Sequence, residues 1–371
     1  MKNYFLIFLF FSQSIIVSQV SNFSEKFELP ETINETSGLL FINNKIVTHN
    51  DSGGAANLYE VDNVSGFITR TIVINNAINI DWEDIAEDET HIYIADIGNN
   101  NGNRTNLTIY KILKTDYISS NNVTAEIIRY SYSDQTNFSS QPNNNNFDSE
   151  AISIYQGNII IFTKNWVDLR TNVYTIPKTP GNHSAIRTST FNVNGLITGA
   201  SYNKQKNSFM LTGYDTGLEP FLVHIGWNRN PGNNIFNGGA IKTILTLGAG
   251  SQVEGVVHTG NQNYYISREK FTTSFLGFPI VIKQKVFEFS YQTSSINDIL
   301  MYGENDTIYL SELPGVSITV KFYDALDNLV LTENIVGTNA SISIVSLPVG
   351  VFEVYFEADG GGIHQKLLVR L

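Results

Sequence analysis

The chain has 371 residues, of which 42% are hydrophobic and 12% aromatic, so it can bury a sizeable core and is not a disordered polypeptide. Lys and Arg total 23 against 35 Asp and Glu, and the formal net charge of −12 argues against nucleic-acid binding because an acidic surface repels phosphates. The chain has no cysteine, which excludes a disulfide scaffold, a thiolate zinc site and a cysteine nucleophile.

The N-terminus has the pattern of a secretory signal peptide, which we predict over residues 1–19. Lys2 supplies an early positive charge, residues 5–11 are apolar, and small polar residues follow. The apolar run is too short for a membrane span, which needs about 20 residues, and no other stretch is long enough. Because eukaryotic secreted proteins of this size usually carry disulfides, the sequence predicts a bacterial protein that is secreted or held at the cell surface, with no membrane span after processing.

Five segments of the next part of the chain share a common layout. They align on one column, which is Ser37, Glu83, Glu150, Gly199 and Glu254, with separations of 46, 67, 49 and 55 residues. A small or short residue follows in every copy, namely Gly38, Asp84, Ala151, Ala200 and Gly255. A repeat of this length is typical of stacked β units.

Each segment continues with further short apolar runs. A second run ends in polar residues about 13 to 16 positions after the column. A third has a ring near its centre, at Tyr59, Tyr110, Tyr174, His224 and Phe287, and four segments add a fourth run at residues 67–74, 125–132, 185–193 and 240–247. Four short strands per unit, rich in β-branched and aromatic residues, predict the blades of a β-propeller.

The fifth segment lacks its fourth strand, and residues 24–30 have the pattern and position to supply it. Pairing the N-terminal strand with the last blade would close the ring and leave no open edge. We therefore predict an all-β fold with a five-bladed β-propeller over residues 20–293. A sixth blade could lie in residues 134–146 or 228–239, and a β-sandwich of similar strands is the alternative that the ordered recurrence disfavours.

The repeat is lost in the tail, and residues 294–371 predict a small C-terminal β-sandwich. Alternating segments place strands at residues 307–310, 316–323, 329–334, 341–345, 350–358 and 365–371.

Three segments of the tail, residues 322–330, 346–354 and 366–370, resemble the C-terminal sorting domain of Bacteroidetes proteins that use type IX secretion. The resemblance implies the type IX secretion machinery as a partner. Residues 302–306 stand where that family usually has a Pro-Asn-Pro element, and a plain accessory β-sandwich is the alternative.

The first part of the chain resembles secreted Bacteroidetes propellers related to the SdiA-regulated and esterase-like phytase groups. The segments that carry this resemblance are residues 35–39, 49–53, 81–86 and 95–104. It implies a fold and a location more than a reaction.

Propeller geometry predicts which polar residues meet. The first strand of a blade lines the channel and the second runs back antiparallel, so the start of one and the end of the other share a face. The residues placed at this mouth are Glu35, His49, Asn50, Asp51, Asp81, Glu83, Asp84, Asp96, Asp148, Glu150, Lys164, Glu254, Arg268 and Glu269, joined by Asn99, Asn100, Asn165 and Asp215.

Two chemical uses of this face follow. Oxygen ligands suit Ca²⁺, and we expect Asp81, Glu83, Asp148 and Glu150 as ligands, with the loop at residues 96–103 as a further source. The leading hypothesis is a propeller that binds an extracellular ligand, glycan or protein there, with Ca²⁺ as the expected cofactor. Because crowded carboxylates raise one another's pKa, the alternative is a metal-dependent hydrolase of phosphate or other esters.

A purely structural role competes with both uses. Glu83, Glu150 and Glu254 recur in register, so they could hold the ring together by accepting backbone hydrogen bonds from neighbouring blades. His49 is the better functional histidine, whereas His224 shares the aromatic column and is expected in the core. The sequence has no Gly-x-Ser-x-Gly elbow and no His-x-x-x-His pair.

Overall fold

The computed structural model describes residues 20–226, 234–238, 240–248, 250–275, 277–291, 299–304, 306–313, 317–358 and 363–370. The signal peptide expected at residues 1–19 lies outside this range. The described fold is nearly all β, with one short helix, α1 (Lys114–Ser119), and two 3-10 turns, η1 (Glu31–Ile33) and η2 (Ile235–Gly238). No helix in the described ranges has the length and apolar character needed to cross a membrane.

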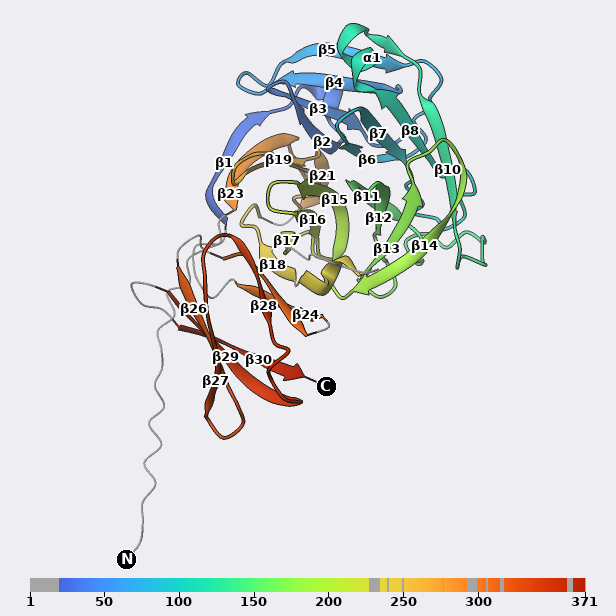
Figure 1. Cartoon of the computed structure of the whole chain (residues 1–371). Helices are drawn as coiled ribbons and strands as arrows, with labels where there is room; N and C mark the ends of the chain where they lie inside the picture. The colour runs from blue at the N-terminus through green and yellow to red at the C-terminus, as the bar shows by residue number, and fades with distance from the viewer. Residues whose placement is uncertain are drawn as a thin grey trace, which may run out of the picture.

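Five blades, each built on four antiparallel strands, are arranged around a common axis, and the first blade has an additional outer strand that pairs in parallel (Figure 1). The first contains β2 (Thr36–Ile42), β3 (Lys45–Asn50), β4 (Asn57–Asp62), β5 (Ile68–Ile74) and β9 (Asn122–Val123). The second contains β6 (Trp82–Glu87), β7 (His91–Asp96), β8 (Thr108–Leu113) and β10 (Glu126–Tyr132), and the third β11 (Ser149–Tyr155), β12 (Asn158–Thr163), β13 (Thr171–Pro177) and β14 (Gly181–Phe191). The fourth contains β15 (Leu196–Asn203), β16 (Ser208–Tyr214), β17 (Pro220–Ile225) and β18 (Ala240–Ile244), and the fifth β19 (Val253–Gly260), β20 (Asn263–Arg268), β23 (Lys285–Tyr291) and β1 (Val20–Glu28).

The innermost strands form a closed ring. β2, β6, β11, β15 and β19 pack side by side in this order, and β19 packs on β2 again. The predicted five-bladed propeller is confirmed, and residues 134–146 contain no strand that could begin a sixth blade. Of the other stretch considered for a sixth blade, residues 228–233 and 239 lie outside the described residues. The second and third blades are also joined at their outer edges, where β10 pairs with β14 in parallel.

The N-terminal strand completes the fifth blade, as predicted. β1 runs antiparallel to β23, from the pair Val20↔Tyr291 to the pair Glu28↔Lys285. Phe23 stacks on Phe287 with ring centroids 5.7 Å apart. Chain segments from opposite ends of the propeller therefore share one sheet, which covers the outer edge of β23.

The core lies between neighbouring blades. The third-strand rings of Tyr59, Tyr110, Tyr174 and Phe287 are buried there. His224 is also buried, as expected from its column, with its ring stacked 4.5 Å from that of Tyr291.

The tail forms two facing sheets. One contains β24 (Leu300–Glu304), β25 (Thr307–Ser311) and β28 (Asn339–Ser343), and the other β27 (Leu329–Ile335), β26 (Ile318–Tyr323), β29 (Gly350–Ala358) and β30 (Ile363–Arg370). Side chains that include Ile308, Phe322 and Phe352 fill the space between them. Glu312 follows β25, and its Oε1 lies 3.1 Å from Nε2 of His224, so a buried pair joins the tail to the fourth blade.

The fifth blade contains a hairpin that was not predicted. Between β20 and β23, β21 (Phe271–Phe275) and β22 (Phe278–Ile282) form a hairpin that pairs with no other described strand.

Candidate functional site

The strand register brings the predicted polar residues to one end of the propeller axis. The start of each innermost strand pairs with the end of its neighbour, as in Thr36↔Asn50, Trp82↔Asp96, Ser149↔Thr163, Leu196↔Tyr214 and Val253↔Arg268. We call this end the acidic mouth, defined by Glu35, Asp51, Asp81, Glu83, Asp148, Glu150, Glu254 and Glu269. Its carboxylates fall into those that have hydrogen-bond donors and those that have none.

Asp84 holds three blades together. Its Oδ1 accepts a hydrogen bond from the backbone N–H of Ile85 (2.8 Å), and its Oδ2 accepts from Ile152 (2.9 Å) and Ala200 (3.3 Å). Burial raises the pKa of this carboxyl, and the N–H groups oppose that shift. The role considered for Glu83, Glu150 and Glu254 is thus filled by Asp84, and in the described part of the chain none of those three carboxylates accepts a backbone hydrogen bond.

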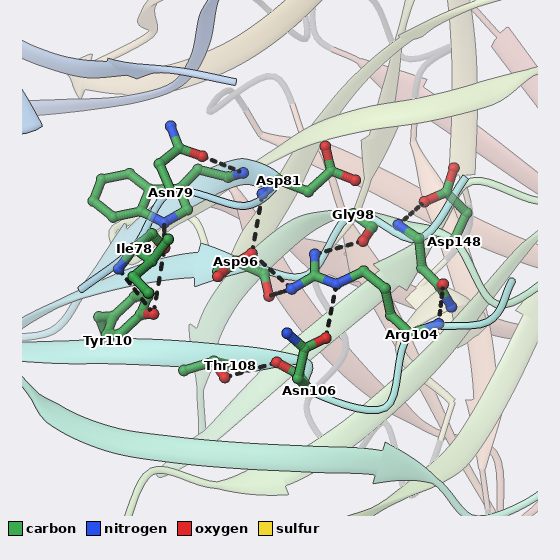
Figure 2. A network of polar contacts seen from close by, with 12 residues as sticks. Ile78, Asn79, Asp81, Asp96, Gly98, Arg104, Asn106, Thr108, Tyr110 and Asp148 are labelled. Carbon is green, nitrogen blue, oxygen red and sulfur yellow. Dashed lines mark hydrogen bonds and ion pairs between the residues drawn. The ribbon is translucent and has the colours of Figure 1, made fainter. Parts of the chain in front are cut away.

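Asp96 is neutralised inside its own loop (Figure 2). Its Oδ1 accepts from the backbone N–H of Asp81 (3.1 Å) and from Nη2 of Arg104 (2.8 Å), and Nη1 of Arg104 donates to the Gly98 carbonyl (2.7 Å). Residues 96–103, which we expected as a ligand source, contain one carboxylate, and its Oδ1 is therefore engaged, whereas its Oδ2 is buried and has no partner among the described residues. The Asp81 carboxylate lies beside this network without joining it (Figure 2).

Asp148 and Glu150 are also provided with donors. Asp148 accepts from the backbone N–H of Asn99 (2.6 Å) and from the Trp166 indole N–H (2.8 Å). The buried Lys164 ammonium donates to both Glu150 oxygens (2.7 and 2.6 Å) and to the Tyr214 hydroxyl (2.9 Å). Burial alone would lower the pKa of Lys164, but the neighbouring acidic groups, Glu150 first among them, together outweigh burial and raise that pKa well above its usual range.

Asp51, Asp81 and Glu83 form a group without donors. One oxygen from each carboxylate lies within 4.8 Å of the other two. Among the described residues none of these carboxylates accepts a hydrogen bond or pairs with a cation, although Glu83 is only 4% exposed and Oδ1 of Asp51 is buried. Burial, and then mutual repulsion, raises the pKa of Asp51 and Glu83, and burial with the Asp148 charge raises that of Asp81 to about 6.

Gly98 brings the backbone directly against this group. A Cβ at position 98 would overlap Oε1 of Glu83 and Oδ2 of Asp81. A side chain at position 98 would therefore displace these carboxylates, and glycine lets the loop lie directly against both. The four ligands expected from the sequence thus divide, because Asp81 and Glu83 group with Asp51, while Asp148 and Glu150 are bound to protein donors.

The fifth blade adds Glu254 and Glu269 beside Glu35. Glu254 is buried and no described residue donates a hydrogen bond to its carboxylate, and burial raises its pKa well above its usual value. Burial raises the pKa of Glu269 to about 7, and the Glu35 charge adds to this shift while Lys164 opposes it. The acidic mouth therefore exchanges protons near neutral pH.

Three residues predicted to bind a ligand at the mouth, His49, Asn50 and Arg268, are instead engaged within the protein. His49 is fully buried, its ring perpendicular to Trp82 at 5.6 Å, and burial lowers its pKa to about 4, so it is neutral. The Asn50 amide donates to the Thr32 carbonyl (2.8 Å). Arg268 donates to the Lys283 carbonyl and the Ser251 hydroxyl, so its guanidinium is bound on the fifth blade.

The opposite end of the axis, which we call the far mouth, contains a cavity of about 890 Å³. The later parts of the innermost strands and the turns after them line it, including Leu40, Ile85, Ser153, Tyr202, Gln205 and His258. Its acids are paired, Glu87 with Lys114, Asp88 with Lys178 and Glu89 with Lys204. Sequence reasoning from strand starts did not find this cavity.

The fold and the site together define a β-propeller with an acidic channel mouth. No family model matches the chain, and no curated protein matches it. Among solved structures it is similar to the PQQ-bound aldose sugar dehydrogenase of Streptomyces coelicolor (10% identity, 73% of this chain and 98% of that one, TM-score 0.40). It is also similar to an exo-β-1,3-galactanase of Phanerochaete chrysosporium (10% identity, 94% of this chain and 98% of that one, TM-score 0.42). Neither likeness assigns a substrate or cofactor to this chain, so its function has to be inferred from its own residues.

Proposed function

We propose that this protein is a binding propeller whose acidic mouth holds a divalent cation, with Ca²⁺ as the best candidate, and engages an extracellular ligand there. The observation that supports this is the group of Asp51, Asp81 and Glu83. Their oxygens converge within 4.8 Å and receive no donor from the described protein. Buried carboxylates without partners are costly, and a bound cation would remove that cost.

The donor set suits a hard cation. Ca²⁺ takes six to eight oxygen ligands, and carboxylates are its commonest protein ligands. Three side chains would leave coordination positions for water or for oxygen atoms of a ligand. Such a partly filled site is suited to recognition of hydroxyl, carboxylate or carbonyl groups, which covers both a glycan and a protein as ligand.

Isothermal titration of the whole chain with CaCl₂ tests the proposal. We expect one site, with a Kd of about 10⁻⁴ to 10⁻³ M as in other extracellular modules. Glu83→Gln should weaken binding by at least about tenfold, because it removes one charged ligand. Glu89→Gln at the far mouth is the matched control, since it neutralises a carboxylate outside the acidic mouth.

Two results would contradict the cation site. One is no heat of binding at millimolar CaCl₂ with a folded protein. The other is an equal affinity in the Glu83→Gln and wild-type chains. Unfolding of Glu83→Gln would favour the structural role, and circular dichroism at the titration temperature separates that outcome from a loss of ligands.

A metal-assisted hydrolase is the second candidate, favoured by the pKa of about 7 of Glu269. A carboxyl group that titrates near neutrality can act as a general base beside a cation. Hydrolysis of p-nitrophenyl phosphate and p-nitrophenyl acetate, with Ca²⁺ and with EDTA, measures this activity. Turnover that requires Ca²⁺ and is lost in Glu269→Gln would support the hydrolase over the binding protein.

We further propose that the chain is exported from a Bacteroidetes cell and that its tail is read by type IX secretion. The signal-like residues 1–19 and the sorting-domain resemblance of the tail support this. Deleting residues 296–371 should stop delivery to the surface, measured by immunoblotting of culture fractions. Unchanged delivery would contradict the sorting role. The Glu312→Gln variant, which keeps the tail, controls for loss of the contact with His224.

A further inference from the structure

The hairpin β21–β22 exposes apolar side chains at the surface. Residues 271–282 contain no charged residue. Phe278 is 74% exposed, Val281 50% and Ile280 41%, and no other described strand pairs with either strand. A two-stranded hairpin has little stability of its own in water, so exposed apolar groups on it suggest a contact with another molecule.

The two faces of the hairpin differ. The register places Phe271, Thr273, Ile280 and Ile282 on one face, and Thr272, Ser274, Pro279 and Val281 on the other. At the base of the first face, Ile282 lies 2.6 Å and Phe271 3.4 Å from where a Cβ on Gly250 would be, so the base is anchored on the loop before β19. The outer part of the same face, with Ile280, is left uncovered.

The base of the hairpin adjoins the acidic mouth. Phe271 follows Glu269 by two residues, and the backbone N–H of Lys270 donates to the Asn34 carbonyl (2.7 Å), next to Glu35. Neither Glu35 nor Glu269 forms an ion pair with a described cation. An apolar surface therefore lies next to two carboxylates that lack positive partners.

The strand edges favour an extended partner. Both strands have a free edge, since no described strand lies outside them. Pro279 has no N–H and so interrupts the outer edge of β22, whereas β21 consists of Phe, Thr and Ser residues with every N–H present. The edge of β21 can accept an added strand.

We propose that the hairpin, with Glu35 and Glu269, forms a docking surface for an extended polypeptide segment that carries an apolar side chain beside Lys or Arg. This rests on the proposed function in one respect, that the acidic mouth is the ligand face. The carboxylates of Glu35 and Glu269 would attract the Lys or Arg of the partner segment. The exposed side chains of Phe278 and Ile280 would contact its apolar side chain. A lipid bilayer fits less well, because one hairpin face carries Thr272 and Ser274 and the chain has a net charge of −12. A second copy would bring two acidic mouths together.

The test selects a random dodecapeptide library displayed on phage against the whole chain, in the presence of CaCl₂. We expect enriched peptides with an apolar residue next to Lys or Arg. In fluorescence anisotropy, a synthetic peptide of that sequence should bind at least about tenfold more weakly to the double variant Phe278→Ser/Ile280→Ser. Glu269→Gln should weaken it as well. The matched control is Val64→Ser/Phe67→Ser, two exposed apolar residues of the first blade, which should bind like wild type.

Several results would overturn the docking proposal. These are no enrichment, an acidic consensus, or binding that the hairpin variant leaves unchanged. Binding to phosphatidylcholine vesicles that the hairpin variant abolishes would assign the hairpin to a bilayer instead. A dimer in sedimentation that the same variant dissociates would assign it to a second copy. If Ca²⁺ titration fails but peptide binding still needs the hairpin, the cation site is wrong and the docking surface stands.

Discussion

The two ends of the propeller axis are built from the same five strands but treat their charges differently. At the far mouth each of Glu87, Asp88 and Glu89 has a lysine within salt-bridge distance. At the acidic mouth Lys164 is committed to Glu150, and Asp51, Asp81 and Glu83 have no positive partner among the described residues. The fold can therefore place paired charges at a strand end, and the unpaired group is a property of one mouth alone.

The difference has an energetic meaning. An exposed pair such as Glu89 with Lys204 at the far mouth contributes about 0–1 kcal/mol. Carboxylates that are buried and close to one another oppose folding when ionised. Unpaired carboxylates at Asp51, Asp81 and Glu83 should therefore lower the stability of the unliganded protein, and a bound cation would offset that loss. The paired acids of the far mouth should show neither effect.

The largest effect is expected at Asp84. Asp84→Ala would leave the buried N–H groups of Ile85, Ile152 and Ala200 without acceptors, at about 1–3 kcal/mol each. We expect a loss of about 5 kcal/mol in the free energy of unfolding, measured by urea denaturation. A loss below about 1 kcal/mol would mean that the blades do not depend on this carboxylate.

A smaller loss is expected when the buried Lys164 ammonium of the acidic mouth is removed. Lys164→Met leaves Glu150 buried and unpaired, which should cost about 3 kcal/mol. Lys204→Met removes the exposed partner of Glu89 and should cost less than about 1 kcal/mol. Equal losses in the two variants would contradict the distinction between the mouths.

The pH dependence of stability should differ with and without Ca²⁺. A carboxyl whose pKa is raised by folding contributes stability that is present below its unfolded pKa and is lost as the pH rises through its folded pKa. The unliganded protein should therefore lose stability from about pH 4 upward, through the pKa of about 6 at Asp81 and about 7 at Glu269. Bound Ca²⁺ should reverse this loss, because it favours the ionised carboxylates.

Calorimetric Tm values at about pH 4, 6 and 8, with CaCl₂ and with EDTA, measure this effect, at about 2–4 °C for each kcal/mol. His49 acts in the opposite direction below its unfolded pKa, because folding lowers its pKa to about 4. The comparison of wild type with Glu83→Gln cancels that contribution. The variant should be more stable than wild type in EDTA at about pH 8 and less responsive to CaCl₂. A Tm that is independent of pH and Ca²⁺ would contradict the raised carboxyl pKa values.

The sequence predicted the fold well because the repeat records strand order directly. The five units, the closing strand expected at residues 24–30 and found as β1 at residues 20–28, and the strand at residues 350–358 all follow from periodic apolar runs. The hairpin β21–β22 was not predicted, since it lies inside a blade between β20 and β23 and has no counterpart in the other units.

The site was harder to predict because pairing depends on side-chain direction. The column of Glu83, Glu150 and Glu254 suggested one shared role, yet Glu150 is bound by Lys164 while Glu83 faces Asp51 and Asp81. One signal was present in the sequence. Asp84 is the only charged residue in a column of Gly and Ala, and a charge at a position where small residues fit marks the carboxylate that binds backbone N–H groups.

The smallest effect is expected at the far mouth, and it tests the comparison most directly. Glu89→Gln removes a charge whose partner Lys204 is exposed, so stability should change by less than about 1 kcal/mol. Its Ca²⁺ affinity should equal that of wild type, because Glu89 lies at the opposite end of the innermost strands from Asp51, Asp81 and Glu83. A fall in Ca²⁺ affinity similar to that of Glu83→Gln would show that the whole acidic charge of the chain attracts the ion, and the acidic mouth would then have no special role.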